Sequence, residues 1–230
     1  MSTALTAVLI MCKIPYIVPC KTRMKPDLSE EQCAGLQDAL LMDTLDMMRI
    51  LPFSTYVAYA PLNGKEYFDG ISGIKEAFPQ TQGDLGQRLI EATNYVFSKG
   101  FTKMLVIGGD CPELQPTRIQ EASQALDSAD VCIGPTDDGG YYLIGLKKPT
   151  KELFTGIDWS TERVFQQTYA ATLKTGATVC VLPQGRDVDL WEDLVALHHK
   201  MNTLSWEKRP NRTENFISKV MEKKVEENNA

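Results

Sequence analysis

The sequence predicts an α/β fold, with a mainly parallel central sheet that carries helices on both faces. The 230 residues are 43% hydrophobic and 23% charged, the composition of an ordinary globular chain that can bury a sizeable core. Helical stretches separate most of the apolar runs, and runs that are apolar on both faces are typical of parallel strands covered by helices. The runs of strand length are 4–12, 55–60, 103–108, 131–134, 141–146 and 177–182.

The first two helices are predicted from their capping residues. Ser29 has Gln32 three residues later, the spacing of a capping box, and the helix that it opens should end before Pro52. Asp84 is the expected N-cap of a second helix. That helix should end at Gly100, because glycine suits the left-handed residue that follows a helix.

Two further core helices follow the same logic. Pro116 suits the first position of a helix that ends near Leu126, because that position needs no backbone donor. Ser160 or Thr161 is expected to cap the next helix, which should run to Gly176.

The chain is predicted to be one domain with a helical extension. Residues 1–204 form the domain, and residues 205–230 carry a narrow apolar stripe at helical spacing. Such a stripe needs a partner, so we expect this helix to dock on the domain or on a second subunit of a homo-oligomer.

Charge and hydropathy exclude several functional classes. The chain has 24 basic and 30 acidic residues, a net charge of −6, and no extended Lys/Arg stripe, so we expect no nucleic-acid partner. The apolar stretch 4–12 is too short for a membrane span of about 20 residues, and no positive charge precedes it as in a signal peptide. We expect a cytoplasmic protein whose six cysteines are reduced and serve packing.

A basic loop follows the first predicted strand. Lys13, Lys21, Arg23 and Lys25 place four cations within thirteen residues of an acidic protein. In parallel sheets ligands bind beyond the carboxyl ends of strands, where such side chains suit a phosphate or diphosphate. The alternative is a solvated surface loop.

The third apolar run ends on a carboxylate. Asp110 follows Gly108 and Gly109, and an Asp at a strand end is a hard oxygen ligand for Mg²⁺ or Mn²⁺. The alternative is a cap of a turn before Pro112. Asp189 precedes a predicted helix and would be its N-cap if taken alone. Paired with Asp110, it is a candidate second ligand of one divalent cation.

Two glycine-rich segments are the remaining candidates. Gly83 and Asp84 open the second helix, whose N-terminal amides could meet a phosphate or a base, or simply start the helix. The run 136–142 predicts a tight hairpin turn, or the floor of a sugar-like acceptor site formed by Asp138, Gly139, Gly140 and Tyr141. Asp138 would bind the acceptor and act as the base. His198 and His199, the only histidines, lie on a polar helix and give a His-based mechanism little support.

Several spaced motifs, taken in order, agree with one family. They are Lys13-x-Pro15 with Lys21-Thr22-Arg23-Met24, Gln82-Gly83-Asp84-Leu85-Gly86-x-Arg88, Gly109-Asp110-Cys111-Pro112, Asp138-Gly139-Gly140-Tyr141-Tyr142, Trp159-Ser160-Thr161 and Asp187-Val188-Asp189. Over roughly residues 4–200 the chain resembles bacterial glycosyltransferase-like proteins of the nucleotide-diphospho-sugar transferase superfamily. The resemblance implies a GT-A fold, Asp110 and Asp189 as metal ligands, Lys21 and Arg23 in the phosphate-binding loop, and Trp159 near the substrate.

Three functions remain open from the sequence. The first is a glycosyltransferase that uses a divalent cation, Mg²⁺ or Mn²⁺, and transfers a sugar from a nucleoside-diphosphate sugar to a small acceptor. The second is a nucleotidyltransferase of the guanylyltransferase kind, which would release pyrophosphate. The third is a nucleotide-binding protein without turnover, because Pro15-Tyr16-Ile17-Val18 replaces the Pro-x-Pro-Gly usual in the family. The Asp-Gly-Gly-Tyr-Tyr run favours the first.

Overall fold

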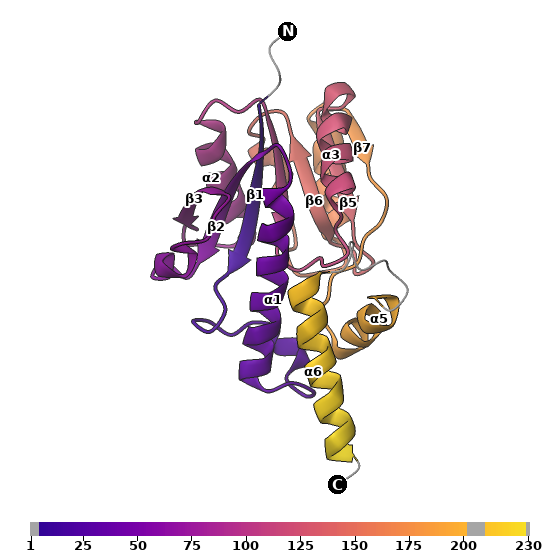
Figure 1. Cartoon of the computed structure of the whole chain (residues 1–230). Helices are drawn as coiled ribbons and strands as arrows, with labels where there is room; N and C mark the ends of the chain where they lie inside the picture. Colours follow the sequence, from indigo (N-terminus) through magenta and orange to yellow (C-terminus); the bar gives the residue numbers. More distant parts are fainter. Residues whose placement is uncertain (1–4, 202–209, 229–230) are drawn as a thin grey trace.

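In the computed structural model, which describes residues 5–201 and 210–228, one seven-stranded sheet lies between two layers of helices (Figure 1). The strand order is β3-β2-β1-β4-β6-β5-β7. Only β6 runs antiparallel to its neighbours, so the prediction of a mainly parallel α/β sheet is confirmed. The strands are β1 (Thr6–Lys13), β2 (Ser54–Ala60), β3 (Ile74–Pro79), β4 (Lys103–Gly108), β5 (Val131–Pro135), β6 (Tyr141–Leu146) and β7 (Val179–Val181).

Two core clusters separate the helix layers. On one face, residues of α1 (Glu30–Arg49) and α3 (Pro116–Ser128) pack on the sheet around Leu41, Ile107 and Ile119. On the other face, α2 (Leu85–Phe97) and α4 (Val164–Lys174) pack on it around Leu89 and Ile144. The central parallel strands β1, β2, β4 and β5 are therefore apolar on both sides, as the composition of their runs predicts.

Capping explains the observed starts of two helices. Ser29 and Gln32 form the predicted capping box of α1, and Asp84 and Gln87 form one at α2. The fourth helix differs from the prediction. It begins at Val164, and its N-cap, Arg163, makes no side-chain capping bond, so capping by Ser160 or Thr161 was wrong.

A third core cluster lies beyond the carboxyl edge of the sheet, where α5 (Trp191–Met201) and α6 (Asn211–Asn228) meet the outer half of α1 (Figure 1). Its buried residues are Met24, Leu28, Cys33, Leu36, Leu40, Val188, Leu194, Leu197, Met201, Ile217 and Val220. The cluster contains Met24, which follows Lys21 and Arg23, and Val188, which precedes Asp189. It therefore fixes the position of the two segments that carry these predicted site residues.

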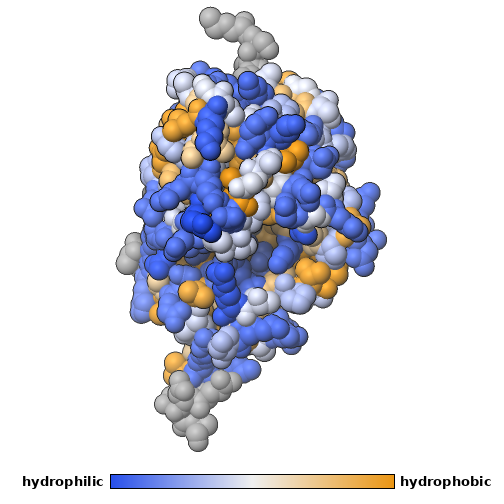
Figure 2. Space-filling view, turned by 180° about the vertical axis from the view of Figure 1, so that it is seen from behind, coloured by the Kyte–Doolittle hydropathy of each residue, from blue (hydrophilic) through white to orange (hydrophobic). Residues whose placement is uncertain are grey.

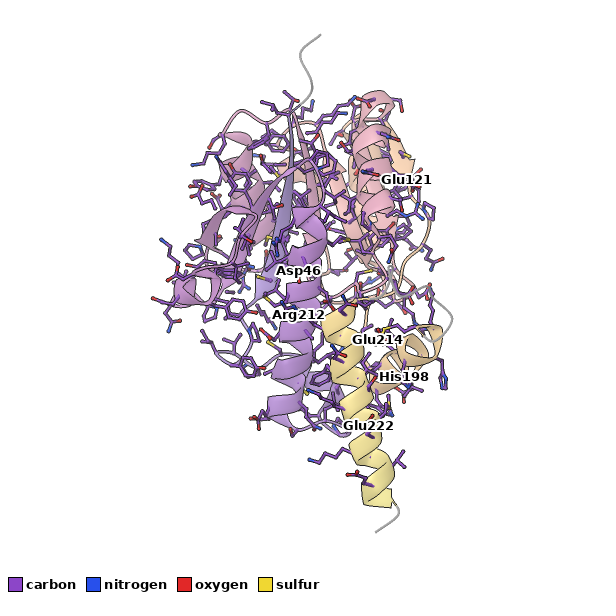
Figure 3. All side chains as sticks on the ribbon, in the orientation of Figure 1. Asp46, Glu121, His198, Arg212, Glu214 and Glu222 are labelled. Atoms are coloured by element: carbon purple, nitrogen blue, oxygen red, sulfur yellow. The ribbon has the colours of Figure 1, made fainter. Side chains whose placement is uncertain are left out.

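Polar contacts hold the start of α6 against α1. Asp43 accepts hydrogen bonds from the backbone N–H groups of Arg212 and Thr213, and the Arg212 guanidinium lies 3.4 Å from Asp46 (Figure 3). The C-terminal helix thus docks on α1 and α5 of its own chain, one of the two predicted arrangements. The predicted domain boundary at residue 204 lies outside the described residues.

No helix in the described part of the chain is long and apolar enough to cross a membrane. The face opposite that of Figure 1 is mostly hydrophilic, with small separate apolar patches (Figure 2). All six cysteines are free thiols, and five of them are buried, in agreement with a packing role.

Candidate active site

The candidate site lies at the carboxyl edge of the sheet, where the loops after β1, β4, β5 and β7 meet. Asp110 comes two residues after β4, and Gly109 before it packs against Leu41 of α1. The Gln37 side-chain amide, buried on α1, donates a hydrogen bond to Asp110 Oδ1 over 3.1 Å. Asp110 is therefore oriented from the helix side, while about 42% of its side chain remains exposed.

Lys21 joins the two predicted metal ligands. Its ammonium Nζ lies 3.1 Å from Asp110 Oδ2 and 3.0 Å from Asp189 Oδ1. Because both oxygens are about 3 Å from the same nitrogen, they are at most about 6 Å apart. The structure thus brings Asp110 and Asp189 together, with the chain's own cation between them.

Residues 187–189 lie in a segment without regular secondary structure between β7 and α5. The Val188 backbone N–H donates to the Asp110 carbonyl over 3.3 Å, and the Val188 side chain is buried in the third core cluster. The Asp189 carboxylate reaches Lys21, and Asp187 lines the neighbouring cavity close enough to Asp110 for their charges to interact.

Asp189 is not the N-cap of α5, because Leu190 is the residue that directly precedes the helix and its carbonyl accepts the first helical hydrogen bonds. Asp193, the third helical residue, reaches back instead, and its Oδ2 accepts from the backbone N–H groups of Asp189 and Leu190. The Asp189 carboxylate instead accepts a hydrogen bond from Lys21. It is thus available to the site.

The acidic cluster consists of Asp110, Asp187 and Asp189 together with the Lys21 ammonium. Burial and neighbouring charges shift the pKa of Asp110, Asp187 and Lys21. Burial alone would raise the pKa of Asp110, but the Lys21 ammonium and the Gln37 amide hold that pKa below its usual value. Burial raises the pKa of Asp187 to about 7, and the nearby Asp110 and Asp138 carboxylates contribute. Lys21 is also buried, yet the two carboxylates raise its pKa, so it stays charged.

Asp187 and Gln37 are site residues that sequence reasoning missed as candidates. For Asp187, the available signal was its place in the Asp187-Val188-Asp189 motif. For Gln37, no local signal exists, because a Gln inside an amphipathic helix looks like any solvated position.

A cavity of about 300 Å³ opens beside the acidic residues. Gly140, Tyr141 and Trp159 line it, as do Leu85 and Asp187. These residues come from β6 and its hairpin, the loop before α4, the start of α2 and the segment after β7. A volume of this size lies at the lower end of the range for small-molecule sites.

Asp138 and Gly139 form the hairpin turn between β5 and β6. Asp138 Oδ1 accepts hydrogen bonds from the Thr136 hydroxyl and the Gly140 backbone N–H. Gly139 has φ 86°, and an added Cβ would come within 2.0 Å of the Glu162 carbonyl. The hairpin prediction is confirmed, and backbone conformation and packing are sufficient to explain the glycine at position 139.

The structure does not place every predicted residue at the acidic cluster. Lys13 is exposed at the end of β1, and Arg23 is exposed with its guanidinium 4.0 Å from Asp189. Asp84 caps α2 through Oδ1, and Gly83, at φ 121°, accepts a hydrogen bond from Arg88 through its carbonyl. The helix-start interpretation of Gly83 and Asp84 thus accounts for their contacts.

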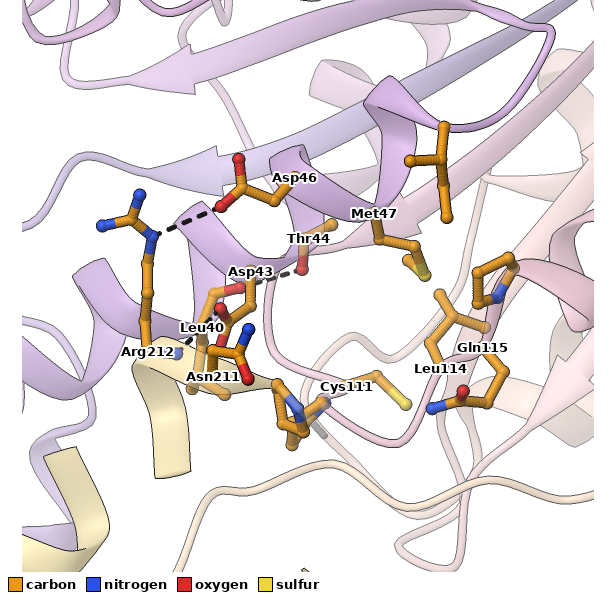
Figure 4. A pocket seen from close by; sticks show the side chains of 14 residues that line it. Leu40, Asp43, Thr44, Asp46, Met47, Cys111, Leu114, Gln115, Asn211 and Arg212 are labelled. Atoms are coloured by element: carbon orange, nitrogen blue, oxygen red, sulfur yellow. Dashed lines mark hydrogen bonds and ion pairs between the residues drawn. The ribbon is translucent and has the colours of Figure 1, made fainter. Parts of the chain in front are cut away.

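A larger cavity, about 470 Å³, lies between α1, α6 and the loop before α3 (Figure 4). Asp43, Asp46 and Arg212 form one wall, and Cys111 and Gln115 lie on the opposite side. None of the predicted site residues lines it. It is therefore separate from the acidic cluster.

The protein part of a metal site would be small. Within residues 5–201 and 210–228, no group of three or more His, Cys, Asp or Glu side chains is arranged to hold a metal ion. Asp110 and Asp189 are two carboxylates whose outer sides are open. Mg²⁺ is commonly held by one or two carboxylates together with phosphates and water, so this pair fits such a cation.

A family model described as "Uncharacterized protein conserved in bacteria (DUF2064)" matches residues 44–161, about half of the chain. The chain belongs to this family. None of the curated proteins matches this DUF2064 member.

Solved structures share the fold of this DUF2064 protein. A "putative nucleotide-diphospho-sugar transferase" from Desulfovibrio desulfuricans G20 is 28% identical, with a TM-score of 0.84, over 93% of this chain and 94% of that one. A cytidylyltransferase from Leptospira borgpetersenii is 15% identical, with a TM-score of 0.55, over 94% and 95%. Rv0371c of Mycobacterium tuberculosis H37Rv, in complex with manganese, is 14% identical, with a TM-score of 0.50, over 84% and 97%. The protein has the fold of nucleotide-diphospho-sugar transferases.

Proposed function

We propose that this DUF2064 protein is a cytoplasmic, metal-assisted glycosyltransferase. It binds a nucleoside-diphosphate sugar through Mg²⁺ or Mn²⁺ and transfers the sugar to a small acceptor. The observation that carries the proposal is the convergence of Asp110 and Asp189 on one ammonium at the carboxyl edge of the sheet, beside a cavity of about 300 Å³.

The proposed metal ligands are Asp110 and Asp189. Their side chains are 42% and 41% exposed, whereas the Lys21 side chain between them is only 2% exposed. Lys21 therefore approaches from the protein interior, and both carboxylates remain partly open to solvent. A divalent cation there would neutralise charge on the leaving diphosphate. The manganese bound to Rv0371c, a protein of the same fold, is consistent with this proposal.

The remaining residues divide between donor and acceptor. Arg23, exposed beside Asp189, is the proposed partner of the diphosphate, because a guanidinium forms forked hydrogen bonds with phosphate oxygens. Lys13 adds positive charge at the end of β1, and we place Gly83 and Asp84 on the nucleotide side. These assignments rest on position alone, because the contacts of Asp84 and Gly83 are made within the start of α2.

We place the acceptor against the cavity wall formed by Gly140, Tyr141 and Trp159, with Gly139 in the adjoining turn. Aromatic rings suit the apolar face of a sugar-like molecule. Asp138 Oδ1 accepts both turn hydrogen bonds, and neither goes to Oδ2. Asp138 Oδ2 is the proposed acceptor of the proton from the attacking hydroxyl.

The test is an assay of released products. The protein is incubated with Mn²⁺, a panel of nucleoside-diphosphate sugars and small hydroxyl acceptors, and nucleoside diphosphate and pyrophosphate are measured separately. A glycosyltransferase releases nucleoside diphosphate. Pyrophosphate release from a nucleoside triphosphate and a sugar phosphate would instead identify a nucleotidyltransferase, and binding without either product would identify a protein without turnover.

Matched variants localise the activity. Asp110→Asn should remove nucleoside-diphosphate release, because the proposed metal ligand loses its charge. Glu121→Gln changes an exposed carboxylate on α3 that pairs with Arg118, and it should leave release unchanged. Equal losses in both variants would contradict an active site at Asp110.

We also propose that the exposed part of α6 contributes to a homo-oligomer. Val225 near its end is 59% exposed, although most of the apolar stripe packs on α1 and α5. Light scattering of wild-type protein and of Val225→Glu tests this. A monomeric wild type would contradict it.

A further inference from the structure

The Lys21 ammonium lies between two carboxylates, a position in which a metal ion would otherwise be expected. Its Nζ is within 3.1 Å of two carboxylates from distant parts of the chain, and 2% of its side chain is exposed. Its backbone has φ 47° and ψ 39°, the left-handed conformation that a non-glycine residue adopts only at some cost. The chain therefore holds this ammonium at a defined point.

Packing in the third core cluster anchors the backbone on both sides of the ion pair between Lys21 and Asp189. The Lys21 carbonyl accepts the backbone N–H of Met24 over 2.9 Å, and the Met24 side chain is fully buried in the third core cluster. On the other side, Val188 anchors Asp189 in the same cluster. The backbone segments that carry Lys21 and Asp189 are thus both anchored in one packed cluster.

The ammonium changes the charge that a second cation meets. Two carboxylates alone carry a charge of −2, and with Lys21 the group carries −1. The affinity of an oxygen site for a divalent cation rises with the number of ligand charges, and a neighbouring ammonium repels the cation. The open outer sides of Asp110 and Asp189 remain accessible, but the free protein should hold a cation there only weakly.

We infer that Lys21 is a resident cation that keeps the Asp110–Asp189 pair from binding a divalent metal tightly until nucleotide phosphates add their charge. The inference rests on the proposed function for the identity of the site. It makes Lys21 a positioning residue, which holds the two carboxylates together and sets the order of binding. If Lys21 bound phosphate instead, its removal would weaken the binding of nucleotide and leave the affinity for Mn²⁺ alone unchanged.

The experiment measures Mn²⁺ alone, without nucleotide. Lys21→Met removes the ammonium and retains most of the side-chain volume. Calorimetry and the paramagnetic resonance signal of free Mn²⁺ should show binding tightened roughly ten-fold or more relative to wild type. The further tightening produced by a nucleoside diphosphate should shrink in the same variant, because the site no longer depends on phosphate charge.

Controls separate the local effect from net charge. Lys25→Met removes an exposed cation of the same loop, 40% exposed and paired with Glu30, and it should leave Mn²⁺ affinity unchanged. Lys21→Arg keeps the charge and should retain weak binding. If Lys21→Met fails to fold, as judged by circular dichroism, Lys21→Gln supplies a neutral side chain that can still donate to a carboxylate.

The outcomes distinguish this inference from the proposed function. Unchanged or weaker Mn²⁺ binding in Lys21→Met and Lys21→Gln overturns the inference, even if the wild type transfers sugars. Tighter Mn²⁺ binding in the variants supports it, even if no donor is turned over by the wild type. Equal tightening in Lys25→Met also overturns it, because the effect would then be one of general charge.

Discussion

The backbone N–H of Val188 donates to the carbonyl oxygen of Asp110 over 3.3 Å, and this bond joins the loop after β7 to the loop after β4. The Val188 side chain is buried in the third core cluster, and the adjacent Asp189 carboxylate reaches Lys21 beside Asp110. The bond thus links the two loops that carry the predicted metal ligands.

The first prediction concerns Asp110 and Asp189. Asp110→Ala or Asp189→Ala should abolish the Mn²⁺ dependence of nucleotide binding, because the proposed site has only two protein ligands and one carboxylate alone would not hold the cation. The double variant should cost little more than either single variant. Calorimetric titration with and without Mn²⁺ measures this. Additive losses would show that the two carboxylates act at separate places.

The second prediction concerns Arg23, which is 62% exposed and 4.0 Å from Asp189. Arg23→Ala should weaken the binding of a nucleoside diphosphate by about 1.5–3 kcal/mol, the scale of a hydrogen bond to a charged group. The free nucleoside should bind almost as before. If calorimetry finds equal losses for both ligands, Arg23 does not contact the phosphates.

The third prediction concerns Asp138. Asp138→Asn keeps a side-chain oxygen that can accept the two turn hydrogen bonds but removes the base, so transfer should be suppressed while donor binding is intact. Transfer rates and donor affinity are measured on the same preparation. An equal fall in donor affinity would indicate that the substitution only disturbs the hairpin.

The fourth prediction concerns Ile217, a fully buried residue of α6 in the cluster that also holds Met24 and Val188. Ile217→Ala should lower the free energy of unfolding by about 2–5 kcal/mol, because it leaves a cavity in a packed core. Urea denaturation measures this. Glu222→Ala, at an exposed position of the same helix, should change stability by less than about 0.5 kcal/mol. Similar values for the two variants would contradict the docking of α6.

Local patterns determined most of the elements. The capping boxes at Ser29 and Asp84 both form, and the runs 103–108 and 141–146 are strands with the predicted bounds. These signals act between residues only a few positions apart, so they need no knowledge of the rest of the chain. The strand β3 was missed because its residues are only partly buried at the sheet edge, and its alternation is weak.

The tertiary structure decided which acidic and basic side chains meet. The sequence paired Asp110 with Asp189 and assigned Lys21 to phosphate, both as hypotheses, and only the fold shows that the Lys21 ammonium lies between the two carboxylates. Gln37 entered the site without any local signal. Such contacts depend on which strands pair and which helices cover them, and that choice follows from burial summed over the whole core rather than from any short segment.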